Sequence, residues 1–407
     1  MDLNNNFINN SISDLYNSGN NCNNVNIKKA ARGVILLCGL MFSVFSVTYL
    51  FVFQKDILEA LHFSLAHGKT VFVPFASALV ITVILLLLRW GINALLGLKG
   101  AFRSLAYLPS FLVLMALTDV GRSVYNSHYH TVWGWLLPLL IVAFAGVGFM
   151  VRRMVRSDMS MGLGSLGMYI SNIIIMLAFS MITILNGTTD KSMHRELEME
   201  HLLKKGKNME ALKTAEKAYD PTRTLTALRM LAMSKEGVVG DRLFDYPQYY
   251  KADGLFFDND STKTLRYTND SIYSHLGDRP KYGESPQDFL KRICDSETGS
   301  YKAAEYYMAA MLLNKRLDSF CEVLNGYFVK GDTLPKYYRE AVVLYLDCNP
   351  DWKSDVLTDS IGLKETELRF REYKEKQKSG YGSSNEEKNR MRRAFGKTYW
   401  WYYDYQE

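Results

Sequence analysis

Residues 165–186 read SLGMYISNIIIMLAFSMITILN, twenty-two residues without a Lys, Arg, Asp or Glu. A helix of this length can cross the hydrocarbon core of a bilayer, which requires about 20 mostly apolar residues. The character of the chain then changes, because the stretch MHRELEMEHLLKKGKNMEAL from Met193 carries a charge every few positions. This boundary predicts a transmembrane domain before residue 187 and a soluble domain over residues 187–407.

Four further apolar stretches precede this one, and the same length criterion predicts that they are transmembrane helices. They cover residues 33–53, 71–88, 104–120 and 132–151. The third contains Pro109, a break that neighbouring helices can compensate inside a membrane, and whether it crosses fully stays open. We therefore expect an all-α protein with about five transmembrane helices over residues 33–186, followed by a soluble helical domain.

Residues 1–32 precede the first apolar stretch and contain the Asn-rich run NNNFINNSISDLYNSGNNCNNVN. Such a segment has too few apolar side chains to build a core, so we expect it to be disordered. The apolar stretch follows KKAAR, as in a signal peptide, but continues through SVTYLFVF without a small-residue cleavage site. We therefore expect an uncleaved signal anchor.

The basic residues of the transmembrane domain indicate its orientation. Nine of them fall on one side of the predicted spans and three on the other. The nine are Lys28, Lys29, Arg32, Arg89, Lys99, Arg103, Arg152, Arg153 and Arg156, and the three are Lys55, Lys69 and Arg122. Because cytoplasmic loops carry the excess of Lys and Arg, residues 1–32 are expected in the cytoplasm. An odd number of spans then exports the soluble domain, whereas an even number would keep it in the cytoplasm.

The net charge of +6 belongs to the transmembrane domain. Residues 1–186 carry 12 Lys and Arg against 6 Asp and Glu, whereas residues 187–407 carry 36 of each kind. A nucleic-acid-binding domain would gather basic residues in its soluble part. The charge distribution therefore argues against DNA or RNA as a partner.

The soluble domain begins with a pattern of paired helices. The stretch after Met193 predicts three helices broken at Gly206 and Pro221, since glycine commonly ends a helix and proline suits a first turn. The spacing of Gly206, Ala211 and Ala218 resembles the turn glycine and small packing residues of a tetratricopeptide repeat. The match is partial, because the early aromatic residue of that repeat is absent.

Three further segments complete the soluble domain. A second helical unit begins near Ser300, where apolar and aromatic residues recur at helical spacing. Between the units, residues 237–286 are rich in Gly, Pro, Asn and Asp, and either shape a binding face or form a poorly structured connector. The chain ends in RMRRAFGKTYWWYYDYQE, with six aromatics among residues 399–405. We expect this run to pack against the helices, the alternative being an interfacial membrane anchor.

The five cysteines form no CxxC pair and have no His at metal-ligand spacing. Cys22 and Cys38 precede the soluble domain, which contains Cys294, Cys321 and Cys348. An oxidising compartment would allow one disulfide among these three, but ordinary buried thiols are the simpler expectation. We expect neither a metal nor a cofactor.

Ionisable residues near the span ends are the candidate site residues, because such groups at membrane depth are commonly functional. The segment TDVGRSVYNSHYH holds Asp119, Arg122, His128 and His130. The two histidines suit a shared metal, Asp119 with His128 suits a proton relay, and His67 of the preceding loop would complete either site. The plainer interpretation is a set of interfacial polar residues with an Asp119–Arg122 ion pair. No residue is assigned as catalytic.

Other motifs give no support to a common enzyme chemistry. DNDST at residues 258–262 resembles the start of a calcium loop but lacks its glycine and its bidentate glutamate. GxxxxGK[ST], GxSxG and HExxH do not occur in the sequence, which removes the commonest cues for nucleotide, serine-hydrolase and zinc-protease chemistry. The sequence therefore favours a non-enzymatic protein.

Three phrases carry a family resemblance: GDRLFDYPQYY at residues 240–250, LPKYYREAVVLYL at 334–346 and GKTYWWYYDY at 396–405. They are similar to segments of an uncharacterised family of multi-pass membrane proteins from the Bacteroidota. The resemblance covers most of the chain and implies a Gram-negative inner membrane with a periplasmic soluble domain. It implies no functional residues, because the family has no assigned activity.

Two functions follow as hypotheses. The first is a non-enzymatic inner-membrane scaffold whose periplasmic helical repeats hold a protein partner in envelope assembly or export, since such repeats expose extended concave faces. The alternative is a subunit of an envelope enzyme or transporter, with a lipid-linked or ionic substrate near the four candidate residues of the 118–130 segment. Five spans without internal symmetry argue against a complete transporter. The expected partners are the lipid bilayer and a protein.

Overall fold

The computed structural model describes residues 29–98, 100–121, 132–154, 165–214, 216, 220–258, 264–296, 300–329, 332–353, 361–379 and 383–406. Every regular element in these ranges is a helix. The chain divides into two compact units, Met1–Thr189 and Asp190–Glu407, called here the N-terminal unit and the C-terminal unit. The division lies within a few residues of the predicted domain boundary.

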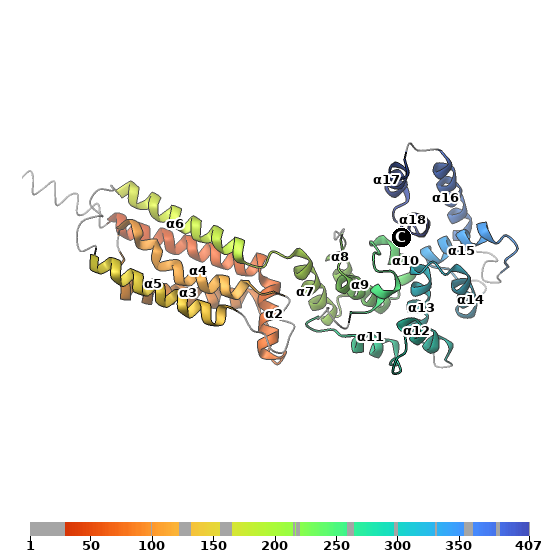
Figure 1. Ribbon diagram of the computed structural model, residues 1–407, viewed down its shortest axis with the longest axis horizontal. Coiled ribbons are helices and arrows are strands. Elements are labelled where there is room, and N and C mark those ends of the chain that lie inside the picture. The colour runs from red at the N-terminus through yellow and green to blue at the C-terminus, as the bar shows by residue number, and fades with distance from the viewer. Residues whose placement is uncertain are drawn as a thin grey trace, which may run out of the picture. The chain divides into compact units, whose positions relative to one another are not determined.

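The N-terminal unit is a bundle of apolar helices (Figure 1). Its first helix covers residues 29–48 and continues as the π-helix η1 (Tyr49–Phe53), followed by α2 (Lys55–Ala66), α3 (Pro74–Leu96), η2 (Gly100–Tyr107), α4 (Leu108–Thr118), α5 (Trp133–Met154) and α6 (Ser165–Asn186). Four of the described helices are long and apolar enough to cross a membrane: Lys29–Phe53, Pro74–Leu96, Trp133–Met150 and Leu166–Asn186.

The predicted span at residues 104–120 has a different form from the other four. It consists of the 3-10 helix η2 and the 11-residue helix α4, and its apolar helical stretch, Phe102–Thr118, is shorter than the other candidates. Pro109 lies at the start of α4, where its missing N–H costs nothing and its ring prevents a continuous α-helix from running through it.

The predicted span at residues 71–88 needs longer bounds, because α3 runs from Pro74 to Leu96. The predicted span ends just before Arg89, a residue that the charge pattern assigns to a loop. In the structure the Arg89 guanidinium lies over the ring of Tyr107, 4.8 Å from its centroid, and the helix continues to Gly97. That glycine ends α3 in the left-handed conformation, with φ of 64°.

Residues 100–118 run beside α6 in the same direction. Near their start, the Asn172 side chain donates to the carbonyl of Gly100 at 3.0 Å and accepts from the Ser104 N–H at 2.7 Å. At their end, the N–H of Thr188 donates to the carbonyl of Thr118 at 2.9 Å. The segment η2–α4 therefore extends along most of the length of α6.

The first helix and α3 pack on the same segment in opposite directions. The Phe42 ring of the first helix lies 5.2 Å from the ring of Tyr107, and its later residue Tyr49 bonds the hydroxyl of Thr118 at 3.1 Å. The first helix is therefore parallel to η2–α4. Because α3 starts beyond the Tyr49 end and brings Arg89 to Tyr107, it runs the opposite way.

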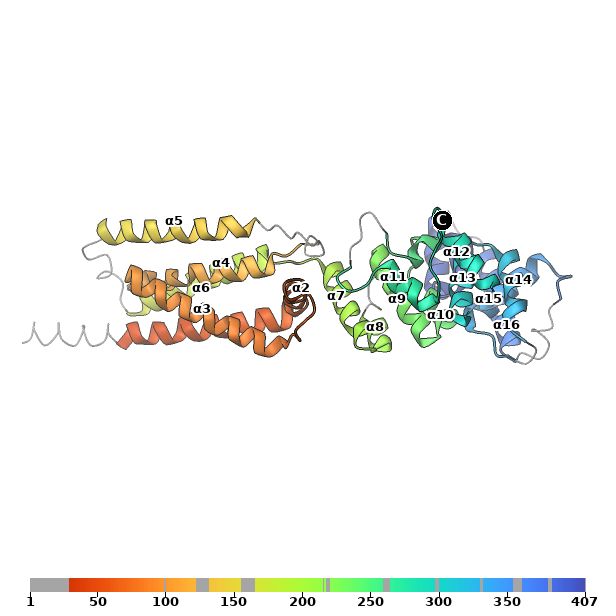
Figure 2. The same cartoon turned by 90° about the horizontal axis from the view of Figure 1, so that it is seen from below.

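Helix α5 is antiparallel to η2–α4 as well. Its first residue, Trp133, bonds Asp119 at the end of α4, and its later Gly148 faces the side chain of Leu96 at the end of α3. The five apolar segments therefore alternate in direction along the chain. Helix α2 runs across one end of the bundle in Figure 1 and is seen end-on in Figure 2.

The C-terminal unit contains the remaining helices (Figures 1 and 2). They are α7 (Lys191–Lys204), α8 (Asn208–Thr214), α9 (Arg223–Glu236), α10 (Val239–Arg242), η4 (Leu243–Asp245), η5 (Lys251–Leu255), α11 (Asn269–Leu276), α12 (Pro286–Asp295), α13 (Tyr301–Leu313), α14 (Leu317–Tyr327), α15 (Lys336–Cys348), α16 (Ile361–Lys378), α17 (Ser384–Phe395) and α18 (Tyr399–Tyr405). Helices α9 and α13 are buried along nearly their whole length and form the centre of the core.

The helix breaks expected near the start of this unit occur in the structure. Gly206 has φ of 72° between α7 and α8, and Pro221 precedes α9, which Thr222 caps by accepting the N–H of Leu225 at 3.2 Å. Ala211 is fully buried. Ala218, the third residue of the predicted repeat spacing, lies outside the described residues.

The remaining expectations for this unit have structural outcomes too. Residues 237–258 of the predicted insertion form short helices whose apolar side chains belong to the core. The cysteines of the unit are free thiols; Cys294 and Cys321 are buried and Cys348 is exposed. Burial raises the pKa of the Cys321 thiol to about 12, so this side chain acts as a small apolar core residue.

Candidate functional site

One of the four candidate residues predicted from the sequence lies in the described part of the chain. Asp119 follows α4, is exposed, and accepts a hydrogen bond from the indole N–H of Trp133 at 2.8 Å. It thereby connects the end of α4 to the start of α5. Arg122, His128 and His130 lie outside the described residues, so the predicted ion pair, proton relay and shared metal site stay hypotheses.

The two histidines between the first helix and α3 have other neighbours: His62 belongs to α2, and His67 follows it. The Nε2 atom of His62 lies 3.0 Å from the hydroxyl of Thr70. His67 ends α2 in the left-handed conformation, with φ of 50°. Within the described ranges neither histidine bonds Asp119, so the structure does not bring His67 into a site with that carboxylate.

The other sequence-based metal candidate is the calcium-like segment. Asp258, its first residue, pairs with Arg223 at 3.6 Å, and residues 259–262 lie outside the described part of the chain. In the part that is described, no three His, Cys, Asp or Glu side chains gather as metal ligands.

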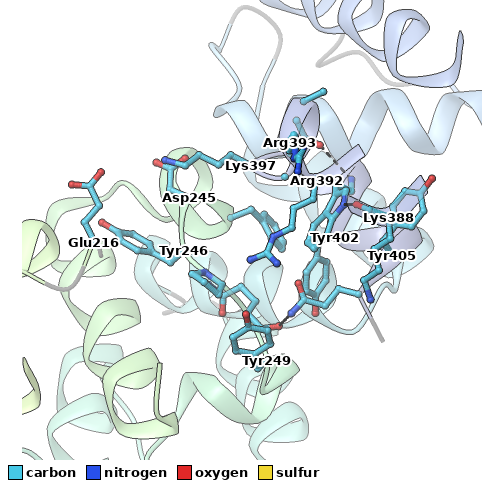
Figure 3. A pocket seen from close by; sticks show the side chains of 18 of the residues that line it. Glu216, Asp245, Tyr246, Tyr249, Lys388, Arg392, Arg393, Lys397, Tyr402 and Tyr405 are labelled. Carbon is cyan, nitrogen blue, oxygen red and sulfur yellow. Dashed lines mark hydrogen bonds between the residues drawn. The ribbon is translucent and has the colours of Figure 1, made fainter. Parts of the chain in front are cut away.

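A cavity of about 990 Å³ opens in the C-terminal unit (Figure 3). Two segments provide most of its wall, residues 244–249 and residues 388–406, and Glu216 and Arg369 add to it. The first segment is part of the phrase GDRLFDYPQYY, and the second is the aromatic C-terminal stretch with its basic cluster. Two segments that are far apart in the sequence therefore line the same cavity.

An aromatic cluster holds the first segment in place. The ring of Phe244 lies 5.1 Å from the ring of Tyr337, 5.2 Å from that of Tyr399 and 4.8 Å from that of Tyr402. Tilted and edge-on ring pairs at these distances add to the stability that burial provides. Because Tyr399 and Tyr402 belong to α18, the cluster also links the two walls of the cavity.

Tyr246 is fixed on both its ring face and its hydroxyl. The guanidinium of Arg229 lies 4.7 Å from its ring centroid, and the hydroxyl donates to the carbonyl of Leu212 at 3.3 Å. Arg229 is only 1% exposed, and burial lowers its pKa to about 10. The buried guanidinium of Arg229 therefore packs on the Tyr246 ring and fixes the position of this wall residue.

The turn between α17 and α18 shapes the second wall. Thr398 caps α18 by accepting the N–H of Trp401 at 3.3 Å. A Cβ atom at Gly396 would lie 2.3 Å from the carbonyl oxygen of Arg392, closer than any side chain tolerates. Only glycine therefore allows the chain to leave α17 and enter α18 at this angle.

Helix α18 is anchored in the core of the unit. The indole of Trp400 donates to the carbonyl of Glu340 at 2.7 Å, and the Tyr399 N–H donates to the carboxylate of the same residue at 2.7 Å. The hydroxyl of Tyr402 donates to the carbonyl of Leu313 at 2.6 Å. The prediction that the aromatic run packs against the helices is therefore confirmed.

The wall of the cavity is strongly basic. Five cationic residues line it against two acidic ones; the cations are Arg369, Lys388, Arg392, Arg393 and Lys397, and the acids are Glu216 and Asp245. None of the five cations makes an ion pair with a described residue, although the Arg392 guanidinium lies 5.9 Å from a ring centroid of Trp401.

Asp245, by contrast, is already neutralised within the fold. Its carboxylate accepts a hydrogen bond from the hydroxyl of Tyr337 at 2.7 Å and lies 3.6 Å from Arg242 and 3.7 Å from Lys336. Its charge is therefore not free to balance the cations of the wall. Figure 3 shows Arg392, Lys388 and Tyr402 across the cavity from Tyr246 and Tyr249.

No sequence pattern predicts this cavity. The C-terminal stretch is conspicuous for its basic and aromatic residues, and residues 237–286 form a binding face in one of two alternatives, but no local pattern relates the two segments. The usable signal was a density of Arg, Lys, Tyr and Trp within residues 388–405, which is also the composition of interaction surfaces.

Comparison with known proteins places the chain in a family but not in a functional class. No curated protein and no solved structure matches it. A family model described as a family of unknown function, DUF6057, matches residues 125–280 and 282–406. This range contains every residue that lines the cavity and most of the chain. The protein belongs to the DUF6057 family.

Proposed function

We propose that this protein is a membrane-anchored interaction protein whose C-terminal unit binds an acidic segment of a partner protein in the cavity. The observation that carries the proposal is the set of five cations that line one cavity without an ion pair to a described residue. Opposite charges attract more strongly in a cleft than on an open surface, because the walls focus the field. An acidic peptide supplies several such charges on a short chain.

The side chains of the cavity suit recognition of carboxylates. Arg369, Arg392 and Arg393 carry planar guanidinium groups that bind carboxylates through two parallel hydrogen bonds. Tyr249, which is 48% exposed, and Trp401 add ring surface for the apolar parts of a peptide. The volume of about 990 Å³ lies at the upper end of the range for ligand pockets, about 300–1,000 Å³.

The composition of the wall favours binding over catalysis. Among the described residues that line the cavity there is no Ser, Cys or His, the side chains that most often serve as nucleophile or general base. The one hydroxyl of a Thr, on Thr398, is engaged in capping α18. The five cations of the wall can orient and neutralise an anion.

The alternation of the apolar segments supports a topology for the proposed function. Because η2–α4 extends along most of α6, we infer that it crosses the membrane as a fifth segment. With the basic residues on the cytoplasmic side, five crossings place the C-terminal unit on the opposite side. The family resemblance adds a Gram-negative inner membrane of the Bacteroidota and a periplasmic location. The helix pairs α7–α8 and α13–α14 would then act as a tetratricopeptide-like scaffold.

Direct binding of an acidic peptide tests the proposal. The purified full-length protein is titrated with fluorescein-labelled octaglutamate, and binding is followed by anisotropy. Arg369→Glu, and separately the Arg392→Glu/Arg393→Glu pair, should weaken binding at least tenfold, because each reverses charge in the wall. Binding should also weaken as salt rises, since the cations are exposed.

The matched control is Arg371→Glu, because Arg371 is also exposed on α16 but does not line the cavity. It should change the dissociation constant less than twofold. Equal losses for Arg369→Glu and Arg371→Glu would mean diffuse surface charge and would contradict the proposal. Tight, Arg369-dependent binding of oligogalacturonate without binding of octaglutamate would instead identify an acidic glycan as the ligand.

A further inference from the structure

Two arginines lie half-buried between the helices of the N-terminal unit, far in sequence from the cavity. Arg89 belongs to α3 and Arg103 to η2. The guanidinium of Arg89 lies 4.8 Å from the ring centroid of Tyr107. The two arginines are within electrostatic range of each other and of Cys38, so two like charges share one place in an apolar bundle.

The hydrogen-bonding groups at this place are not satisfied within the described structure. The Nε and Nη2 atoms of Arg89 and the Nε atom of Arg103 are buried without an acceptor among the described residues. The side-chain oxygens of Asn93 and Ser104 are also buried without a partner there. Burying charged donors is costly unless an anion neutralises them and accepts their hydrogen bonds.

The described residues of this unit offer no such anion nearby. Its described acidic residues are Asp56, Glu59 and Asp119. The first two belong to α2, which follows the Tyr49 end of the first helix, and the third follows the end of α4. These positions are at the end of the bundle opposite to Arg89 and Arg103, so none of the described acidic residues supplies a counter-charge to the two guanidinium groups.

We propose that Arg89 and Arg103 form a binding site for a phosphate group. Two guanidinium groups within electrostatic range of each other suit the tetrahedral oxygens of a phosphate mono- or diester. The site lies at the bundle end that also carries Lys29 and Arg32, where the phosphates of a lipid leaflet would lie, and basic pockets between transmembrane helices commonly bind lipid headgroups. The phosphate belongs either to a lipid headgroup or to a soluble phosphate compound, and this site is independent of the cavity in the C-terminal unit.

Native mass spectrometry of the full-length protein in a neutral detergent tests the site, with phosphatidylglycerol as the probe. The wild-type protein should retain the lipid, and Arg89→Gln/Arg103→Gln should lower its retention at least tenfold. The matched control is Arg32→Gln, because Arg32 is exposed at the same end of the bundle. It should leave retention unchanged, since it lacks the half-buried surroundings of the pair.

Competition identifies the source of the phosphate. Displacement of the lipid by millimolar inorganic phosphate would indicate a soluble compound, and retention in its presence a lipid; either supports the site. An equal loss in Arg32→Gln, or full retention in Arg89→Gln/Arg103→Gln, would overturn it. If the glutamine pair does not fold, Arg89→Lys/Arg103→Lys keeps both charges but loses the planar groups. That pair should bind at least threefold more weakly, and unchanged binding would also overturn the proposal.

Discussion

Glu340 joins the core of the C-terminal unit to the wall of the cavity through two hydrogen bonds. Its carboxylate accepts the N–H of Tyr399, and its carbonyl accepts the indole N–H of Trp400. Burial raises the pKa of Glu340 to about 7, because a desolvated carboxylate is unfavourable. Burial raises the pKa values of Glu200 and Glu305 to about 7 as well.

These pKa values predict how the stability of the unit depends on pH. A carboxyl group with a raised pKa in the fold ionises first in the unfolded chain, whose ordinary Glu pKa is about 4.3. The contribution of these groups to the free energy of unfolding is therefore largest at acidic pH, below the pKa of the unfolded chain. It decreases as the pH rises towards about 7. Thermal unfolding of the full-length protein should show a lower midpoint at pH 8 than at pH 5.

Glu340→Gln assigns part of this effect to one residue. The amide stays neutral and its oxygen can still accept the Tyr399 N–H, so the midpoint at pH 8 should rise by several degrees while that at pH 5 changes little. The difference between the folded and unfolded pKa of one such group changes the free energy of unfolding by about 4 kcal/mol at most. An equal change at both pH values would show that Glu340 does not titrate in this range.

At the scale of elements, the turn between α17 and α18 determines how the basic residues face the cavity. Gly396→Ala should destabilise the unit by about 1–3 kcal/mol, because its Cβ would meet the carbonyl oxygen of Arg392. Octaglutamate binding should weaken too, since α17 carries Lys388 and Arg392. Both effects are measurable by thermal unfolding and anisotropy on the same preparation.

Gly326→Ala is the matched control for this substitution. Gly326 lies inside α14, and a Cβ there would meet nothing within 4 Å. Alanine is a better helix former than glycine, so this variant should be neutral or more stable by up to about 1 kcal/mol. A similar loss in both variants would mean that the close approach at Gly396 has no special role.

The elements themselves were largely predictable, because their signals are local. A run of about 20 apolar residues specifies a candidate span, and the break residues Gly206 and Pro221 coincide with helix boundaries in the structure. Helix α3 continues past the predicted limit of the span at residue 88, and the ring that Arg89 contacts there, Tyr107, belongs to another helix, a contact that no local pattern predicts. The cavity could not be predicted for the same reason: Phe244 meets Tyr402 only through the tertiary fold.

At the scale of the whole molecule, the short segment η2–α4 decides the topology. Four crossings would leave the residues before the first helix and the C-terminal unit on the same side, and five would separate them. Hydrogen bonds tie the start of η2 to Asn172 and the end of α4 to Thr188. Because η2–α4 runs beside α6 over this length, we expect it to cross the membrane if α6 does.

Cysteine labelling tests this topology in full. Lys29→Cys, Lys69→Cys and Lys378→Cys are made singly in a background without the five natural cysteines, and intact spheroplasts are treated with a membrane-impermeant maleimide. All three positions are exposed; they lie at the start of the first helix, between α2 and α3, and at the end of α16. Five crossings predict labelling at positions 69 and 378 and protection at 29. Protection at 378 together with 29, while 69 is labelled, would mean that η2–α4 does not cross, and the search for a partner would move to the cytoplasm.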